Sequence, residues 1–191
     1  NWSEGKFLSK SDYLIILGDF GFLWEEVPDQ DEINWIKWFE KQKWTTLFID
    51  GNHENHNRLE KLELVPMFGS HVGKVSNSVF HLKRGHIYTV ENKTLFCFGG
   101  AFSNDFDFRV NQENWWPPEI PSEREFQYGL SNLDKCAYEV DYLLFHTIPT
   151  SIQDQLQSKK FNAVDPTCKM LEKYYKKTTF TKGFSGHFGS S

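Results

Sequence analysis

The sequence predicts an α/β fold, and three observations along its 191 residues carry this prediction. Short continuous apolar runs alternate with amphipathic helical stretches in the first third of the chain, which is typical of parallel strands joined by helices. The middle of the chain contains short runs rich in β-branched and aromatic residues, joined by tight turns that indicate antiparallel pairing. Buried-type strands return towards the end. We therefore expect mixed β-sheets covered by helices.

Composition limits the class of protein. With 39% hydrophobic and 17% aromatic residues the chain can bury a core, and its length suits one domain across residues 1–191. A net charge of -5 argues against broad nucleic-acid binding. No apolar run approaches the roughly 18 residues of a membrane span, and the start lacks a signal-peptide pattern. Three widely spaced cysteines, Cys97, Cys136 and Cys168, suggest free thiols, so we expect a cytoplasmic protein.

The first third of the chain contains two strand and helix pairs. Residues 13–17 form a continuous apolar run, which predicts a strand covered on both faces. Asp29 stands three residues before Glu32, a pattern that predicts a helix start, and apolar residues recur at helical spacing as far as residue 42. Residues 45–49 predict a second buried strand, and residues 55–64 a second helix.

The rest of the chain changes character twice. Residues 79–82, 86–90 and 94–98 predict short antiparallel strands, and 99–121 is a long irregular segment of the kind that often carries function. Ser122 and Glu125 form a capping box that starts a helix. Residues 141–145 and 178–184 predict two further strands, separated by a helix at about 165–177.

Four of these strands are followed closely by side chains that can bind a metal. These side chains are Asp19, Asn52 with His53, His146 and His187. In open α/β sheets the residues beyond the carboxyl ends of the strands converge on one site. Oxygen and imidazole donors suit Mn, Fe or Zn rather than calcium. Singly, Asp19 could be a turn residue and each histidine a hydrogen-bonded loop residue, but their joint placement favours a shared catalytic metal site.

The order of these motifs resembles that of the calcineurin-like metallophosphoesterases over the whole chain. The motifs are Gly18-Asp19, Gly51-Asn52-His53-Glu54, His146 after a strand, and Gly186-His187. The most similar subgroup is the small bacterial and bacteriophage phosphoesterases. It shares the motifs Trp115-Trp116-Pro117 and Pro121-Ser122-Glu123-Arg124-Glu125.

The resemblance implies a fold and a reaction. The fold would be two mixed sheets packed as a sandwich and flanked by helices, in four layers. The reaction would be hydrolysis of phosphomonoesters or phosphodiesters by direct attack of a water that bridges two divalent ions. Mn²⁺ would be preferred, with Fe, Zn or Ni as alternatives. The substrate would be a phosphorylated small molecule, a nucleotide or a phosphoprotein.

The resemblance also implies a role for each residue. Asp19 would bridge the two ions and act in catalysis, while Asn52, His146 and His187 would complete the ligand set of the second ion. His53 would face the phosphate and protonate the leaving oxygen or stabilise charge there, with Glu54 supporting it. Asn52 and His53 would both contact substrate.

Two departures from the family pattern affect the first ion. No Asp-x-His precedes Gly18, and Gly189 stands where the family has a second His after His187. Asp19 is then the remaining ligand of that ion. We expect that the chain lacks its first strand and its extreme C-terminal part. The alternative to such missing parts is a natural half-site. The alternative functions are a nuclease or dinucleotide hydrolase, or a catalytically inactive binding module on the same fold.

Four further residues leave two interpretations open. Arg109 in the long segment could clamp the substrate phosphate, or could be a surface residue paired with Asp105 or Asp107. Trp115 and Trp116 could form the wall of a substrate groove, or anchor the loop on the core. His56 could line the pocket, but a position on the solvated face of a helix is favoured.

Overall fold

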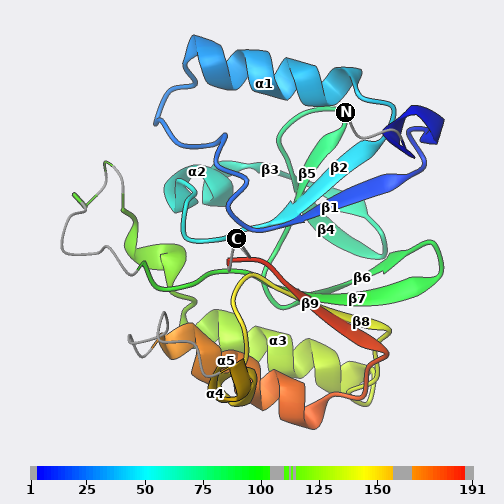
Figure 1. Cartoon of the computed structure of the whole chain (residues 1–191), viewed down its shortest axis with the longest axis vertical. Coiled ribbons are helices and arrows are strands. Elements are labelled where there is room, and N and C mark those ends of the chain that lie inside the picture. The colour runs from blue at the N-terminus through cyan, green and yellow to red at the C-terminus, as the bar shows by residue number, and fades with distance from the viewer. Residues whose placement is uncertain (1–3, 104–109, 112, 114, 157–164, 188–191) are drawn as a thin grey trace.

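The computed structural model describes residues 4–103, 110–111, 113, 115–156 and 165–187. Figure 1 shows two β-sheets stacked between helices, with α1 over one sheet and α3, α4 and α5 under the other. Within the described residues one sheet has five strands in the order β1-β2-β5-β4-β3, and the other has four in the order β6-β7-β8-β9. The expected α/β fold of two mixed, packed sheets is confirmed.

The five-stranded sheet begins with parallel strands. β1 (Tyr13–Leu17) pairs in parallel with β2 (Thr45–Ile49), which pairs in parallel with β5 (Val79–Leu82). The helix α1 (Gln30–Lys41) connects β1 to β2, and the side chain of Asp29 accepts a hydrogen bond from the Glu32 N–H at 2.7 Å, as its position predicts. After α2 (His56–Lys61), the antiparallel strands β3 (Glu63–Met67) and β4 (Ser70–Lys74) complete the sheet.

The four-stranded sheet begins with a hairpin. β6 (His86–Val90) and β7 (Lys93–Phe98) are antiparallel, and Glu91 and Asn92 make the turn with φ of 47° and 61°. β8 (Tyr142–Phe145) and β9 (Lys182–Ser185) then add in parallel. The remaining elements are η1 (Glu4–Phe7), η3 (Pro117–Glu119), α3 (Glu123–Lys135), α4 (Thr150–Leu156) and α5 (Pro166–Lys177). The predicted capping box of Ser122 and Glu125 starts α3.

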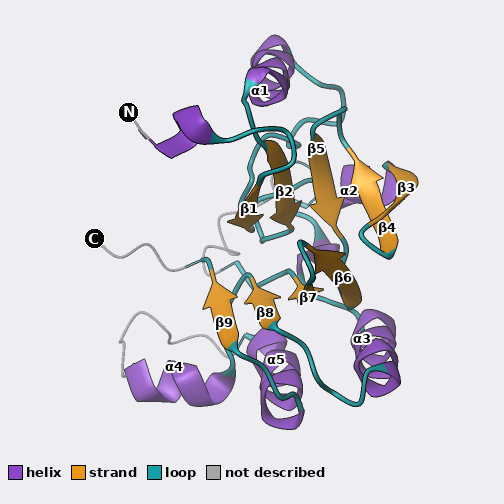
Figure 2. Cartoon of the chain, turned by 90° about the vertical axis from the view of Figure 1, so that its right-hand side faces the viewer, coloured by secondary structure: helices purple, strands orange, loops and turns teal. Residues whose placement is uncertain are grey.

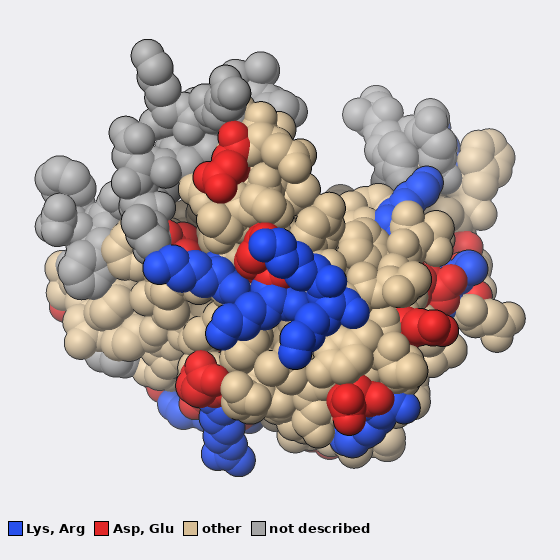
Figure 3. Space-filling view, turned by 90° about the horizontal axis from the view of Figure 1, so that it is seen from below, with Lys and Arg blue, Asp and Glu red and all other residues tan. Residues whose placement is uncertain are grey.

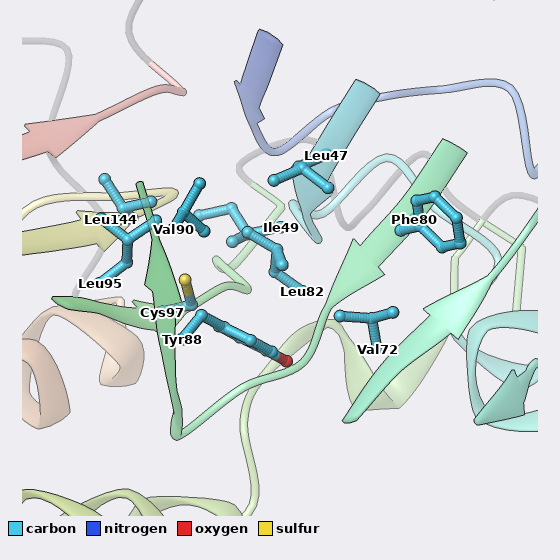
Figure 4. Packing of buried hydrophobic residues seen from close by; sticks show 10 residues of the cluster. All are labelled: Leu47, Ile49, Val72, Phe80, Leu82, Tyr88, Val90, Leu95, Cys97 and Leu144. Carbon is cyan, nitrogen blue, oxygen red and sulfur yellow. The ribbon is translucent and has the colours of Figure 1, made fainter. Parts of the chain in front are cut away.

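Buried apolar side chains hold the layers together. Between the sheets, residues of β2, β4 and β5 face those of β6, β7 and β8 (Figure 4). Below the four-stranded sheet, Phe96 and Phe98 of β7 pack against Tyr174 of α5, with ring centroids 4.8 and 5.0 Å apart. Tyr174 also donates a hydrogen bond to the Phe126 carbonyl at 2.8 Å, which joins α5 to α3. The core therefore fixes both sheets behind the strand ends.

Three sequence-based expectations are wrong in detail. β1 is half-buried along its whole length rather than covered, because it is an edge strand of the described sheet. The expected helix ends at Lys61, and the residues after it enter the β3 and β4 hairpin. The last strand begins at Lys182 and not at residue 178, because Thr178 forms the cap of α5 and Thr179 makes an isolated bridge to Glu139 before the pairing with β8 begins.

The outer face of the lower helical layer is basic. Four lysines of α5 are exposed: Lys169, Lys173, Lys176 and Lys177. Figure 3, seen from below, shows Lys and Arg side chains gathered on this face. The net negative charge of the chain therefore does not extend over it. Among the described residues, every helix is too short or too polar to span a bilayer.

Candidate metal centre and its supporting residues

The loops after four strands meet between the two sheets. In Figure 2 the arrowheads of β1 and β2 point towards those of β8 and β9. Asp19 follows β1, Asn52 follows β2, His146 follows β8 and His187 follows β9. One ligand atom from each of Asp19, His146 and His187 lies within 4.8 Å of the other two. Asn52 Oδ1 adds a fourth, 3.2 Å from His146 Nε2.

His146 lies at the centre of this group, and its side chain is fully buried. Its Nδ1 lies 2.7 Å from the Leu17 carbonyl oxygen, which can only accept, so Nδ1 carries the proton. Nε2 of the neutral ring then turns a lone pair towards the oxygen atoms of Asp19, at 3.3 Å, and Asn52. Such an arrangement is favourable when a cation or an added proton lies among these atoms. Burial lowers the pKa of His146, but the hydrogen bond and charge of Asp19 outweigh it and raise this pKa.

Asp19 is held in an unusual backbone conformation, with φ of 52°. Its Oδ1 accepts hydrogen bonds from the backbone N–H groups of Asn52 and His53, both at 3.1 Å. Burial raises the pKa of Asp19, but the opposing effect of His146 and His53 is larger and lowers this pKa to about 2. A Cβ at Gly51 would collide with the Asp19 carboxylate. The glycine therefore lets an ionised carboxylate lie against the loop that carries Asn52.

Glu54 connects the loop that carries Asp19 to the loop that carries Asn52. Its Oε1 accepts from the Phe20 N–H at 2.5 Å, and its Oε2 accepts from the Gly51 N–H at 2.6 Å. The side chain is fully buried. Burial and the Asp19 carboxylate raise the pKa of Glu54 to about 8. The Gly51-Asn52-His53-Glu54 motif thus contributes a donor, a histidine and the anchor that holds the Asp19 loop.

His53 lies beside the metal-competent group but outside it. Its ring is half-buried and nearly parallel to that of Trp24, with centroids 6.2 Å apart. Trp24 in turn packs edge-on against Trp116 at 5.0 Å, and Trp116 is almost fully buried. For Trp116 the anchoring interpretation is therefore correct, while Trp115 is half-buried. Arg109 lies outside the described residues.

A buried ionic network that sequence analysis missed lies behind the Asn52 loop. Asp50 pairs with His81, at 3.0 Å from Nε2, and with Arg84, at 2.7 Å from Nε. Arg84 also donates to the Glu119 carbonyl at 3.2 Å and pairs with Glu125 at 3.3 Å. Burial opposes ionisation of Asp50, but Arg84 and His81 hold its pKa well below the usual range. A signal was present in the sequence, since Asp50 directly follows β2, just as the Gly18-Asp19 pair directly follows β1.

His56 belongs to this network, and its predicted surface position is wrong. Its side chain is buried because the first turn of α2 packs against Arg84, with Nδ1 3.4 Å from Nη2. Burial and the charge of Arg84 lower the pKa of His56 to about 3. The folded protein therefore keeps this imidazole neutral at pH values where an unfolded chain would protonate it.

This difference predicts a pH effect on stability. Between pH 6.5 and 5, unfolded His56 takes up a proton that the folded chain refuses, so lowering the pH favours unfolding by up to about 1.4 kcal/mol per pH unit. Glu54 acts with the opposite sign and is common to wild type and variant. We expect the free energy of unfolding of His56→Gln, measured with urea, to rise relative to that of wild type as the pH falls. The difference should grow by up to about 1.4 kcal/mol per pH unit. The exposed His71→Gln should show no such gain, and parallel curves for His56→Gln and wild type would contradict the assignment.

One known family matches most of the chain. Residues 3–165 match the family described as calcineurin-like phosphoesterase. Neither the curated proteins nor the solved structures compared with the chain include a match. The family match covers more than half of the chain and contains three of the four strand-end donors, Asp19, Asn52 and His146. This chain therefore belongs to the calcineurin-like phosphoesterase family.

Proposed function

We propose that the chain hydrolyses phosphate esters with divalent metal ions held by Asp19, Asn52, His146 and His187. The convergence of these four donors at His146 Nε2 carries the proposal. His146 meets a usual requirement of a metal-binding histidine, because its other ring nitrogen donates to a backbone carbonyl and fixes the tautomer. The mixture of carboxylate, amide oxygen and imidazole donors suits Mn²⁺, with Fe, Zn and Ni as alternatives. The family is metal-dependent, usually with two divalent ions. The four donors would hold one of these ions, and among the described residues Asp19 is left as the ligand of the other.

The residues of the chain divide the work of the reaction. Divalent ions bound at these donors would polarise the phosphoryl oxygens and lower the pKa of an attacking water. Asp19 supplies a carboxylate that stays ionised at neutral pH and is oriented by two backbone N–H groups. His53 lies next to the donors without joining them, which suits a group that protonates the leaving oxygen or balances its charge.

The proposal predicts metal-dependent turnover of simple esters. We expect hydrolysis of p-nitrophenyl phosphate in Mn²⁺ and its loss on chelation, because the phosphoryl group is activated through the ions. The same assay on bis-p-nitrophenyl phosphate and a short oligonucleotide separates monoesterase, diesterase and nuclease activity. Mn²⁺ binding without turnover of any ester in Mn²⁺, Fe²⁺, Zn²⁺ or Ni²⁺ would favour an inactive binding module instead.

A further inference from the structure

The orientation of the Asn52 side chain matters for any cation at this site. A carboxamide has two ends of similar size, and its oxygen can bind a cation whereas its NH₂ group cannot. Asn52 is almost fully buried, so water does not hold its orientation. Neighbouring groups must therefore decide which end faces His146 and Asp19.

Two buried residues, Ser103 and Glu119, fix the orientation of the Asn52 carboxamide. The Asn52 Nδ2 group donates to Ser103 Oγ at 3.1 Å. The Ser103 hydroxyl donates to Glu119 Oε2 at 2.7 Å, and the Ser103 backbone N–H donates to Glu119 Oε1 at 2.8 Å. Ser103 and Glu119 are both fully buried. The three residues form a chain of hydrogen bonds that runs away from the metal-competent group.

The direction of these hydrogen bonds follows from the chemistry of each group. Each oxygen of the Glu119 carboxyl group accepts one hydrogen bond from Ser103, one from its backbone N–H and one from its hydroxyl. The single hydroxyl proton of Ser103 is then committed to Glu119, so Ser103 offers Asn52 only a lone pair. A reversed Asn52 would place its oxygen against that lone pair with no proton between them, which is unfavourable in a buried site. The NH₂ group must therefore face Ser103, and Oδ1 must face His146.

The position of Glu119 explains the unusual sequence around it. Glu119 ends the short helix η3 after two prolines, and its N–H donates to the Trp116 carbonyl at 2.9 Å. The Trp116 ring packs on Trp24, and the Glu119 carbonyl accepts from Arg84 at 3.2 Å. The aromatic anchor and the buried guanidinium thus hold the backbone of Glu119 on both sides. The Trp-Trp-Pro-Pro-Glu segment delivers a carboxylate to the back of the metal site.

We propose that Glu119, acting through Ser103, is a positioning residue that keeps the Asn52 oxygen directed at the bound metal. The inference rests on the proposed function only in that a cation occupies the site. Its effect is on metal affinity, because reorienting Asn52 replaces a ligand oxygen by an NH₂ group. Supporting hydrogen bonds of this kind typically change metal affinity by roughly 10–100-fold.

Mn²⁺ affinity, measured by calorimetric titration of the metal-free chain, tests the proposal. Ser103→Ala and Glu119→Gln should each weaken Mn²⁺ binding by about 10–100-fold, whereas Ser103→Thr, which keeps the hydroxyl, should restore most of it. Glu119→Gln keeps the size of the side chain but adds a donor that competes for Ser103. Glu123→Gln, an exposed substitution of the same kind four residues away, is the matched control and should leave affinity unchanged.

A double-mutant cycle separates positioning from a merely structural role. Asn52→Asp presents an oxygen in either orientation, so Ser103→Ala should no longer weaken Mn²⁺ binding in that background. An equal loss in both backgrounds would overturn the proposal, as would unchanged affinity in Ser103→Ala and Glu119→Gln. Thermal unfolding of each metal-free variant shows whether it folds. If Ser103→Ala does not fold, the isosteric Glu119→Gln is used for the test instead.

The same titration distinguishes the two proposals. If wild type binds Mn²⁺ but hydrolyses no ester, the proposed function is refuted. The double-mutant cycle then still tests whether Ser103 and Glu119 orient Asn52. Wild type that binds no Mn²⁺ would overturn the positioning role itself.

Discussion

Asp19→Asn should lose both metal and activity. We expect ester hydrolysis to fall by at least about 10²–10³-fold, the scale seen when one preorganised electrostatic group at a reacting centre is removed. The substitution keeps the shape, and an amide oxygen can still accept from the N–H groups of Asn52 and His53. What it removes is the negative charge, which the low pKa of Asp19 maintains across the neutral range.

Metal analysis and steady-state kinetics on the same preparation check this result. Asp31→Asn, an exposed substitution of the same kind in the first turn of α1, is the control and should retain metal content and kcat. The assignment of Asp19 fails if Asp19→Asn keeps wild-type metal content and wild-type turnover together.

His53→Ala should lower kcat while metal content stays near that of wild type. A positioned proton donor contributes roughly 10²–10⁴-fold, and we expect a loss in this range. The backbone N–H of His53 donates a hydrogen bond to Asp19, and alanine retains this donor. The metal-competent group contains Asp19, His146 and His187 but not the His53 ring, so removing the ring should leave the metal donors in place.

The dependence on leaving group identifies the role of His53. Loss of a proton donor should matter more for an alkyl phosphate than for p-nitrophenyl phosphate, whose leaving oxygen needs no protonation. His71→Ala, at an exposed position on β4, provides the control. If His53→Ala lost as much metal as Asp19→Asn, the proposed division between metal binding and proton transfer would be wrong.

Short-range patterns in the residues predicted the central elements and the candidate site. Continuous apolar runs located β1, β2 and β8, and the capping residues Asp29 and Ser122 located the starts of α1 and α3. Both signals depend on neighbours within about four residues, which the sequence displays directly. The donors Asp19, Asn52, His146 and His187 were predictable for a related reason, since each lies within a few residues of a strand end.

Other local features were ambiguous. Residues 62–68 include Leu64, Val65 and Met67 but also Pro66, and neither helical nor strand periodicity prevails there. Pairing with β4 in the tertiary structure decides that they form β3. The half-buried state of β1 also depends on its place at the edge of the described sheet, which its apolar composition does not reveal.

The residues that support the candidate site come from segments that are far apart in the sequence. Asn52 is 51 residues from Ser103, and Asp50 is 34 residues from Arg84, so no local pattern joins them. The sequence does not distinguish a buried carboxylate such as Glu119 from a surface glutamate, because its burial depends on how η3 packs against α2 and on its contact with Ser103. Local sequence patterns therefore identify the side chains that follow the strand ends. Packing of distant segments decided which hydrogen bonds orient them, since those contacts exist only when the two sheets and their loops come together.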